Sequence, residues 1–158
     1  MTETQWLDPA EERLWRCWVR LNAEMSTALH QQLTADSGLS AADYAVLVPL
    51  SEAPDGVLRS KELREEIAWE RDRLSHQVRR MEKRDLVTRE ECPDDARASM
   101  IRITDDGRVA IAAAAPGHVA ATRQVFFDHL SDEEQAALSA VCERLLTNLA
   151  ALSDPPMT

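Results

Sequence analysis

"WERDRLSHQVRRMEKRDLVTR", from Trp69 to Arg89, concentrates positive charge within an otherwise acidic chain. Seven of its residues are Arg or Lys and four are Asp or Glu, a net charge of +3, whereas the 158-residue chain carries −10. Leu74, Val78 and Met81 recur at helical spacing, which predicts an amphipathic helix with one buried face. The side chains on the other faces of this helix are long, polar and mostly basic.

The sequence around this stretch adds a second helix and a β-hairpin. "LRSKELREEIAW" (residues 58–69) predicts a short helix with Leu63 and Ile67 facing inward, three or four residues before the basic helix. Two short helices joined this closely form a helix-turn-helix. After Leu86 the pattern changes from helical spacing to an alternating one within "LVTREE" and within "SMIRIT", which predicts two strands. The segment "CPDDAR" (residues 92–97) between them predicts a turn. We therefore expect a helix-turn-helix followed by a hairpin wing.

Long amphipathic helices are predicted at both ends of the chain. The first has Asp8 as its N-cap, Pro9 at its first position and Glu11 to complete a capping box, and it extends for roughly 25 residues. Ser131 and Glu134 predict the start of the last helix in the same way. Each helix has an apolar stripe: Leu14, Trp18, Leu21, Met25 and Leu29 in the first, and Leu138, Val141, Leu145, Leu149 and Leu152 in the last.

Two more helices are predicted between these parts. Gly38 is expected to end the first helix, and Ser40 with Asp43 forms the capping box of the next helix. Thr104 caps a helix that we expect to kink at Pro116-Gly117. The predicted fold is mainly α with a small β-hairpin wing. It combines a winged helix-turn-helix lobe with a helical region whose apolar stripes exceed what one small core can cover.

Charge and composition limit the function classes. Residues 1–56 carry −6 and residues 105–158 carry −5, whereas residues 57–104 carry +1, so an acidic chain has a locally basic middle. No run of about 18 apolar residues indicates a membrane span, and the acidic N-terminus does not resemble a signal peptide. We expect a cytoplasmic protein without membrane contact. Its three cysteines, Cys17, Cys92 and Cys142, form no CxxC pair, and Cys92 is expected to be exposed in the wing.

Motifs for catalysis and cofactors are missing from the sequence. It has no glycine-rich phosphate loop, no G-x-S-x-G and no HExxH, so we expect neither an enzyme nor a bound cofactor. The histidines, His30, His76, His118 and His129, include no i, i+4 pair, and no metal site is expected.

The basic helix is predicted to read DNA in the major groove. Arginine pairs well with guanine and glutamine with adenine, and a helix of this kind in second place is a recognition helix. The expected base or phosphate contacts are Arg71, Arg73, Ser75, His76, Gln77, Arg79 and Arg80, with Ser60 and Lys61 of the preceding helix on phosphates. The alternative is a solvated helix whose arginines pair with Glu70, Asp72 and Glu82.

Nearly the whole chain resembles the MarR family of winged helix-turn-helix bacterial transcriptional regulators. The most specific match is "DDARASMIRITDDGR", which is similar to the wing signature of the family at Asp95, Arg97, Thr104 and Gly107. "LSHQVRRMEKRDLV" is similar to the end of the family's recognition helix. Here Met81 replaces a common leucine and Asp85 replaces a glycine, and aspartate tolerates the left-handed conformation better than most residues.

This resemblance implies a homodimer that binds double-stranded DNA at a pseudo-palindromic operator. Residues 1–36 and 118–158 would form the helical dimerisation region, and residues 37–117 the DNA-binding lobe. Arg97 is similar to the arginine that reaches the minor groove in this family, and Asp95 would orient it. The alternative is a plain turn, because Asp-Asp-Ala is ordinary turn chemistry.

A regulator of this family would have a switch, and the sequence leaves its nature open. A small aromatic or phenolic effector that releases the DNA would bind near residues of the first two helices: Trp15, Arg16, Trp18, His30 and Tyr44. The alternative places Trp18 in the core. A redox switch at Cys17 is the alternative. Cys17 lies one position away from the place of the sensing cysteine in the organic-hydroperoxide regulators of this family. A dimeric helical scaffold without DNA binding is a further alternative, which a steep salt dependence of DNA affinity would exclude.

Overall fold

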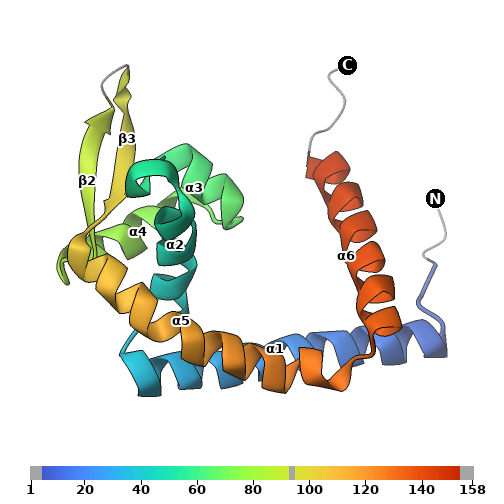
Figure 1. Cartoon of the computed structure of the whole chain (residues 1–158). Helices are drawn as coiled ribbons and strands as arrows, with labels where there is room; N and C mark the ends of the chain where they lie inside the picture. The colour runs from blue at the N-terminus through green and yellow to red at the C-terminus, as the bar shows by residue number, and fades with distance from the viewer. Residues whose placement is uncertain (1–4, 93–94, 154–158) are drawn as a thin grey trace, which may run out of the picture. The chain divides into compact units, whose positions relative to one another are not determined.

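The structure is a computed structural model that describes residues 5–92 and 95–153, with only the backbone described at residues 95–98 and 153. The chain divides into two compact units, Met1–Val119 and Ala120–Thr158. The first unit contains the elements that position the candidate site (Figure 1). In chain order they are α1 (Pro9–Ser37), α2 (Ala41–Glu52), the 3-10 turn η1 (Pro54–Gly56), β1 (Val57–Arg59), α3 (Ser60–Glu66), α4 (Arg71–Glu82), β2 (Val87–Cys92), β3 (Asp95–Ile103) and the greater part of α5 (Asp105–Val125).

Helix α1 begins and ends where its capping residues predict. The Asp8 carboxylate accepts hydrogen bonds from the backbone N–H groups of Ala10 and Glu11, and the Glu11 carboxylate accepts one from the N–H of Asp8. At the other end Gly38 adopts φ 67°, and its N–H donates to the carbonyl of Thr34. The capping box and the glycine stop are confirmed, and the helix is 29 residues long.

The wing is an antiparallel hairpin of β2 and β3, as predicted, with a third strand that was not predicted. Strand β1 pairs with the other edge of β3, so the sheet order is β1-β3-β2. Only Val57–Arg59 form β1, and three residues are too short to show an alternating pattern. Strand pairing reaches further than expected, because Cys92 and Asp95, which we placed in the turn, are paired. Residues 93–94 lie outside the described residues.

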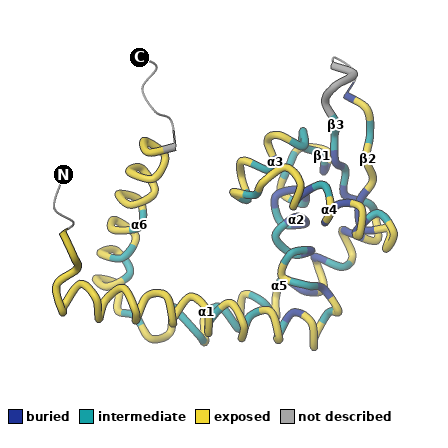
Figure 2. Tube along the Cα trace, turned by 180° about the vertical axis from the view of Figure 1, so that it is seen from behind, coloured by how far each residue is buried: buried dark blue, intermediate teal, exposed yellow. Residues whose placement is uncertain are grey.

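The core lies where α2, α3 and α4 meet the sheet. Leu74, Val78 and Met81 of α4 are all buried, as the helical period predicted. They pack in one cluster with side chains from the other elements of the unit, including Leu33, Leu39, Val46, Leu47, Leu50, Leu63, Ile101 and Ile103. Figure 2 shows this buried centre in dark blue, with the outer face of α4 exposed.

A tight joint connects α4, the wing and α5. Asp85 adopts φ 55°, which confirms the left-handed conformation expected at this position. The Thr104 hydroxyl donates to the Asp85 carbonyl and accepts from the N–H of Gly107, so Thr104 caps α5 as predicted. Helix α5 continues through Pro116 and Gly117 without ending there.

The second unit contains η2 (Phe127–His129) and α6 (Asp132–Ser153). The N–H of Ser131 donates to the Glu134 carboxylate at 2.8 Å, and the N–H of Glu134 donates to the Ser131 hydroxyl at 3.3 Å. This reciprocal pair confirms the predicted start of the last helix. In residues 5–92 and 95–153, no helix combines the length and the apolar character that crossing a membrane requires.

Candidate nucleic-acid interface

Helices α3 and α4 form the predicted helix-turn-helix. Residues 67–70 connect them, and the turn is closed by backbone bonds from Ile67 N–H to Leu63 O and from Trp69 N–H to Arg64 O. Ala68 takes φ 52° in this turn. This left-handed residue helps the chain to change direction within the four residues between α3 and α4.

The solvent-exposed face of α4 is basic, and its guanidinium groups are not used in salt bridges with neighbouring carboxylates of the described residues. Exposed residues on it are Arg71, Arg73, His76, Arg79 and Arg80, with Ser75 partly exposed; of the preceding helix, Lys61 is exposed and Ser60 partly so. In the described part of the chain, no salt bridge joins an arginine of α4 to Glu70, Asp72 or Glu82. The alternative of a self-neutralised surface helix is therefore not supported.

Arg73 has a defined partner at the start of α4. Its guanidinium carbon lies 4.1 Å from the centroid of the Trp69 ring, a cation–π contact. Further along, His76, Arg79, Arg80 and Lys83 line a shallow hollow together with Glu82. The start of α4 thus presents one guanidinium stacked on an aromatic ring, and the rest of the helix presents the exposed guanidinium groups of Arg79 and Arg80.

The structure corrects the prediction for Gln77. We placed it on the solvated flank, but its side chain is buried, and Nε2 donates to Oδ1 of Asp43 at 2.7 Å. The N-terminus of α2 covers this side of α4, which a helical wheel cannot show. Gln77 is therefore directed into the protein, away from any base edge that the exposed face of α4 would meet.

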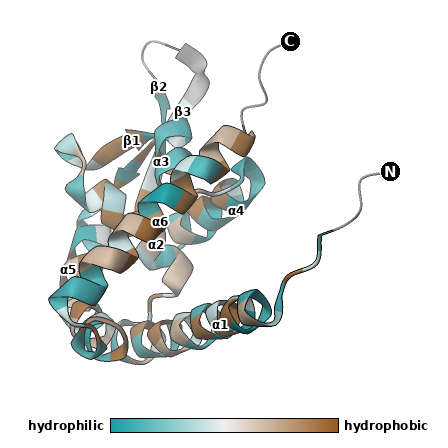
Figure 3. Cartoon of the chain, turned by 90° about the vertical axis from the view of Figure 1, so that its right-hand side faces the viewer, coloured by the Kyte–Doolittle hydropathy of each residue, from teal (hydrophilic) through white to brown (hydrophobic). Residues whose placement is uncertain are grey.

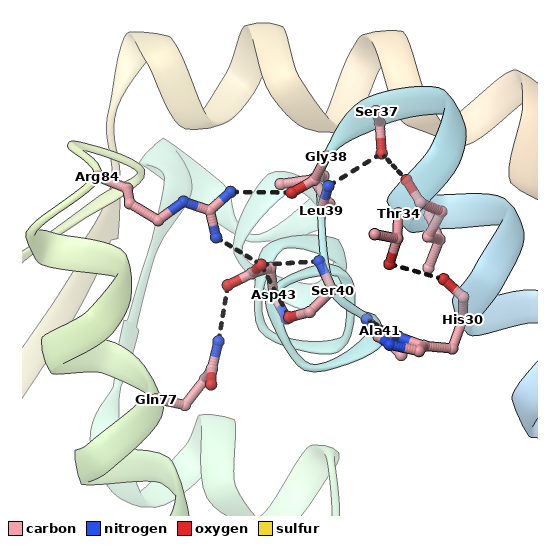
Figure 4. Close-up of polar contacts among 11 residues, drawn as sticks. His30, Thr34, Ser37, Gly38, Leu39, Ser40, Ala41, Asp43, Gln77 and Arg84 are labelled. Atoms are coloured by element: carbon pink, nitrogen blue, oxygen red, sulfur yellow. Dashed lines mark hydrogen bonds and ion pairs between the residues drawn. The ribbon is translucent and has the colours of Figure 1, made fainter.

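Asp43 is the centre of a buried polar cluster (Figure 4). Its Oδ2 accepts from Nη1 of Arg84 at 2.7 Å, from the Ser40 hydroxyl at 2.8 Å and from the Ser40 N–H at 2.8 Å. Burial raises the pKa of Asp43, but the hydrogen bonds from Ser40 and Arg84 outweigh burial, so its pKa lies below the ordinary value. The carboxylate is ionised at neutral pH.

This lowered pKa predicts an acid-sensitive contribution to stability. A group whose pKa is lower when folded stabilises the protein above its unfolded pKa of about 3.9 and loses that contribution as pH falls through the folded value. The difference in unfolding free energy between wild type and Asp43→Asn should be constant above about pH 5 and shrink below about pH 4. Urea unfolding at fixed protein concentration measures it. A difference independent of pH down to acid unfolding would contradict the assignment.

The base of the wing is held by ion pairs. Arg102 of β3 makes two contacts with Glu90 of β2, at 2.6 Å and 3.1 Å, and also donates to the Asp55 carbonyl at 3.1 Å. The hydrogen bond from Arg102 lowers the pKa of Glu90. The side chains of Asp95 and Arg97, predicted to act at the wing tip, lie outside the described residues.

The five predicted effector residues do not converge within one chain. Trp15 and Trp18 are 59% and 43% exposed, so Trp18 is not a core residue of the chain. Arg16 pairs with Glu12, one turn away. His30 lies about 22 Å further along α1 than Trp15 at 1.5 Å per residue.

Near its C-terminus α1 meets α2 and α5. Nδ1 of His30 accepts from the N–H of Ala41 at 3.3 Å, and the ring of Tyr44 lies 4.3 Å from that of His118. His118 also contacts Gln32 of α1 at 3.1 Å. Burial raises the pKa of Tyr44 and lowers that of His118. Of the predicted set, only His30 and Tyr44 belong to this region.

The cysteines differ in exposure. Cys17 is exposed on α1 and Cys142 is partly buried. Cys92, which we expected to be exposed in the wing, is 5% exposed at the end of β2, where the pairing register with β3 shifts. Across residues 5–92 and 95–153, no group of three His, Cys, Asp or Glu side chains could hold a metal ion.

Comparisons with known proteins agree with this geometry. Residues 37–98 match the model of the MarR family. A MarR family transcriptional regulator from Streptomyces coelicolor, solved in complex with DNA, is 35% identical over 98% of this chain and 95% of its own, with a TM-score of 0.88. AbsC, a MarR family transcriptional regulator from the same organism, is 33% identical over 94% of this chain and 99% of its own, with a TM-score of 0.89.

A third structure is more distant. The PcaV transcriptional regulator from Streptomyces coelicolor, in complex with its natural ligand, is 25% identical over 91% of this chain and 98% of its own, with a TM-score of 0.73. Identity above 30% over almost the full length, together with the family model on the helix-turn-helix and β2, establishes the relationship. The chain belongs to the MarR family of DNA-binding transcriptional regulators, which have a winged helix-turn-helix fold.

Proposed function

We propose that the protein is a cytoplasmic, homodimeric repressor that binds a pseudo-palindromic operator and releases it when a small aromatic or phenolic molecule binds. The observation that carries the DNA-binding part is the row of exposed arginines on α4, none of which forms a salt bridge with a carboxylate in the described residues. In a helix-turn-helix, this face enters the major groove.

Dimerisation is supported by apolar surface that the chain leaves exposed. Helix α1 exposes Leu14, Trp15, Trp18, Val19 and Leu21, and helix α6 exposes Val141, Leu145, Leu146, Leu149 and Leu152. Figure 2 shows the N-terminal half of α1 and the length of α6 as exposed, and Figure 3 shows hydrophobic residues along both. Contiguous apolar surface of this kind marks an interface. We assign residues 1–36 and 118–158 to the dimerisation region and residues 37–117 to the DNA-binding lobe.

A two-fold dimer would place two copies of α4 on one face of the DNA. Half-sites would then lie about one helical turn apart in an inverted repeat. Arg97 of the wing, oriented by Asp95, would reach the adjacent minor groove, where narrow A·T-rich segments attract arginine. The acidic remainder of the chain would limit binding to other sequences.

The effector part of the proposal rests on the region where α1, α2 and α5 meet. The rings of Tyr44 and His118 contact each other there at a tilt, and His30 of α1 accepts from the first N–H of α2, so the region combines aromatic rings with polar nitrogens. Aromatic rings with a few polar groups are typical of small-molecule sites. The PcaV regulator was solved with its natural ligand, which makes a ligand-responsive role reasonable to test here.

Two substitutions on neighbouring helices test base reading against phosphate contact. Arg73→Ala should weaken binding by roughly 1–3 kcal/mol for the preferred base at one operator position and relax the preference there. Lys61→Ala, the matched control, should weaken all sequences about equally and lower the salt slope by about one unit.

The measurement is titration of both variants against the operator and its single-base variants at several salt concentrations. An equal loss of affinity on all sequences for Arg73→Ala would mean that α4 does not read bases through this residue. No loss for either variant would contradict DNA binding through α3 and α4.

A further inference from the structure

The polar cluster around Asp43 lies behind the exposed face of α4, and it connects this helix to the start of α2 and to the end of α1. We propose that Asp43 is a positioning residue for operator recognition, which fixes the recognition helix α4 against the start of α2 and the end of α1. This inference rests on the proposed function, because positioning has meaning only if α4 reads DNA.

Asp43 contacts α4 and the residue following it at two points on one side. Oδ1 accepts from Gln77 in the middle of the helix, and Oδ2 accepts from Arg84, just beyond its C-cap, both at 2.7 Å. Arg84 follows Gln77 by seven positions and comes two residues after α4 ends at Glu82, so one bond holds the middle of the helix and the other holds the chain at its C-terminal end. A single bond allows a helix to pivot, whereas two bonds spaced along it fix both its tilt and its rotation.

Asp43 is itself held rigidly at the start of α2. It occupies the third position of that helix, where its carboxylate reciprocates the Ser40 cap through two bonds of 2.8 Å. The side chain is 2% exposed, and in the described part of the chain no buried side-chain nitrogen or oxygen lacks a partner. A fully satisfied buried network of this kind favours one geometry over its alternatives.

Arg84 extends the connection to α1. Its Nη1 bonds Asp43, and its Nη2 donates to the carbonyl of Gly38 at 3.2 Å, at the left-handed residue that ends α1. The end of the exposed apolar helix and the recognition helix are therefore joined through one guanidinium. The Arg84 side chain is 45% exposed, and an ion pair with one solvent-exposed partner contributes little net stability, which favours a geometric role for this cluster.

The test exchanges the donor and the acceptor of the hydrogen bond between Gln77 of α4 and Asp43 of α2. At pH 8, Gln77→Glu places two carboxylates in contact and should lower operator affinity at least tenfold. Asp43→Asn combined with Gln77→Glu turns the bond around, with the asparagine amide donating to the new carboxylate and its oxygen still accepting from Ser40 and Arg84. The double variant should recover operator affinity to within about threefold of wild type.

Affinity for unrelated DNA separates positioning from stability. The affinity of Gln77→Glu for unrelated DNA should stay within about threefold of wild type, because the exposed cations are unchanged. Val46→Ala, on the buried face of α2 outside the cluster, is the matched control. It should lower the melting temperature while leaving the operator affinity of the folded protein unchanged. All titrations are done at a temperature where circular dichroism shows each variant to be folded.

Three outcomes would overturn the inference. Gln77→Glu could lose melting temperature but keep operator affinity, which would make the cluster merely structural. The double variant could fold without recovering affinity. If Gln77→Glu does not fold, Gln77→Leu removes the hydrogen bond to Asp43 without adding a repulsive charge. An unchanged ratio of operator affinity to affinity for unrelated DNA in Gln77→Leu would then contradict the inference. Wild type without any operator preference would instead overturn the proposed function, whatever the variants do.

Discussion

Two charges placed on the apolar stripe of α6, as Leu145→Glu with Leu149→Glu, should convert the proposed dimer to monomers and lower operator affinity at least about 1000-fold. The two leucines are 56% and 57% exposed in the single chain, and they lie one helical turn apart. Burying a leucine contributes about 1.5–3 kcal/mol, and each substitution acts in both copies of a symmetric interface. A buried, unpaired carboxylate opposes association further.

The loss of DNA affinity follows from the loss of the dimer. A monomer binds one half-site without the high effective concentration that a linked second lobe provides. Light scattering measures the assembly and operator titration measures the affinity. Ala140→Glu is the matched control, because it adds one charge on the opposite side of the same helix, next to Arg144, and should remain dimeric. A double variant that stays dimeric, or a monomer that keeps full operator affinity, would contradict the assigned interface.

Gly107→Ala should destabilise the lobe by about 3 kcal/mol, the upper part of the usual range for overpacking. A Cβ at Gly107 would lie 2.1 Å from the carbonyl oxygen of Leu86 and 2.8 Å from a side-chain carbon of Ile103. The carbonyl cannot simply move away, because it also accepts from the N–H of Thr104 at 3.2 Å. The joint between α4, the wing and α5 would have to open.

Gly117→Ala in the same helix is the matched control for this substitution. Its Cβ would meet only the ends of two side chains of α1, Gln32 at 3.3 Å and Asp36 at 3.7 Å, which can move. Replacing a helical glycine by alanine should then stabilise by up to about 1 kcal/mol. Urea unfolding at one protein concentration compares the two variants, since dimer stability depends on concentration. Equal behaviour of the two would show that Leu86 and Gly107 do not pack as described.

Local signals in the sequence predicted the elements well. The caps at Asp8, Ser40 and Ser131 each depend on residues within three positions, so the sequence alone identifies them. The left-handed residue Asp85 was identified through the family resemblance, where a glycine is usual. The inward face of α4 followed from its period, because Leu74, Val78 and Met81 recur at helical spacing. The three-residue strand β1 has no such period and escaped prediction.

The errors arose where one element covers another. Gln77 and Arg84 bond Asp43, which lies 34 and 41 residues away, and no local pattern reports a partner at that distance. Cys92 was expected to be exposed in the wing, but it is buried at the end of β2, where a shift in pairing register breaks the simple alternation. Trp18 lies on the apolar stripe of α1, and period alone cannot separate a stripe that packs within the chain from one that remains exposed.

Selection of bound fragments from genomic DNA by the purified wild-type protein, followed by footprinting of the recovered sites, tests the central claim most directly. We expect an inverted repeat whose half-site centres lie about 10 base pairs apart, protected symmetrically as two copies of α4 require. The genes beside these sites would then suggest the effector. Recovery of no common sequence, or of a single half-site without its inverted partner, would contradict a dimeric, sequence-specific regulator.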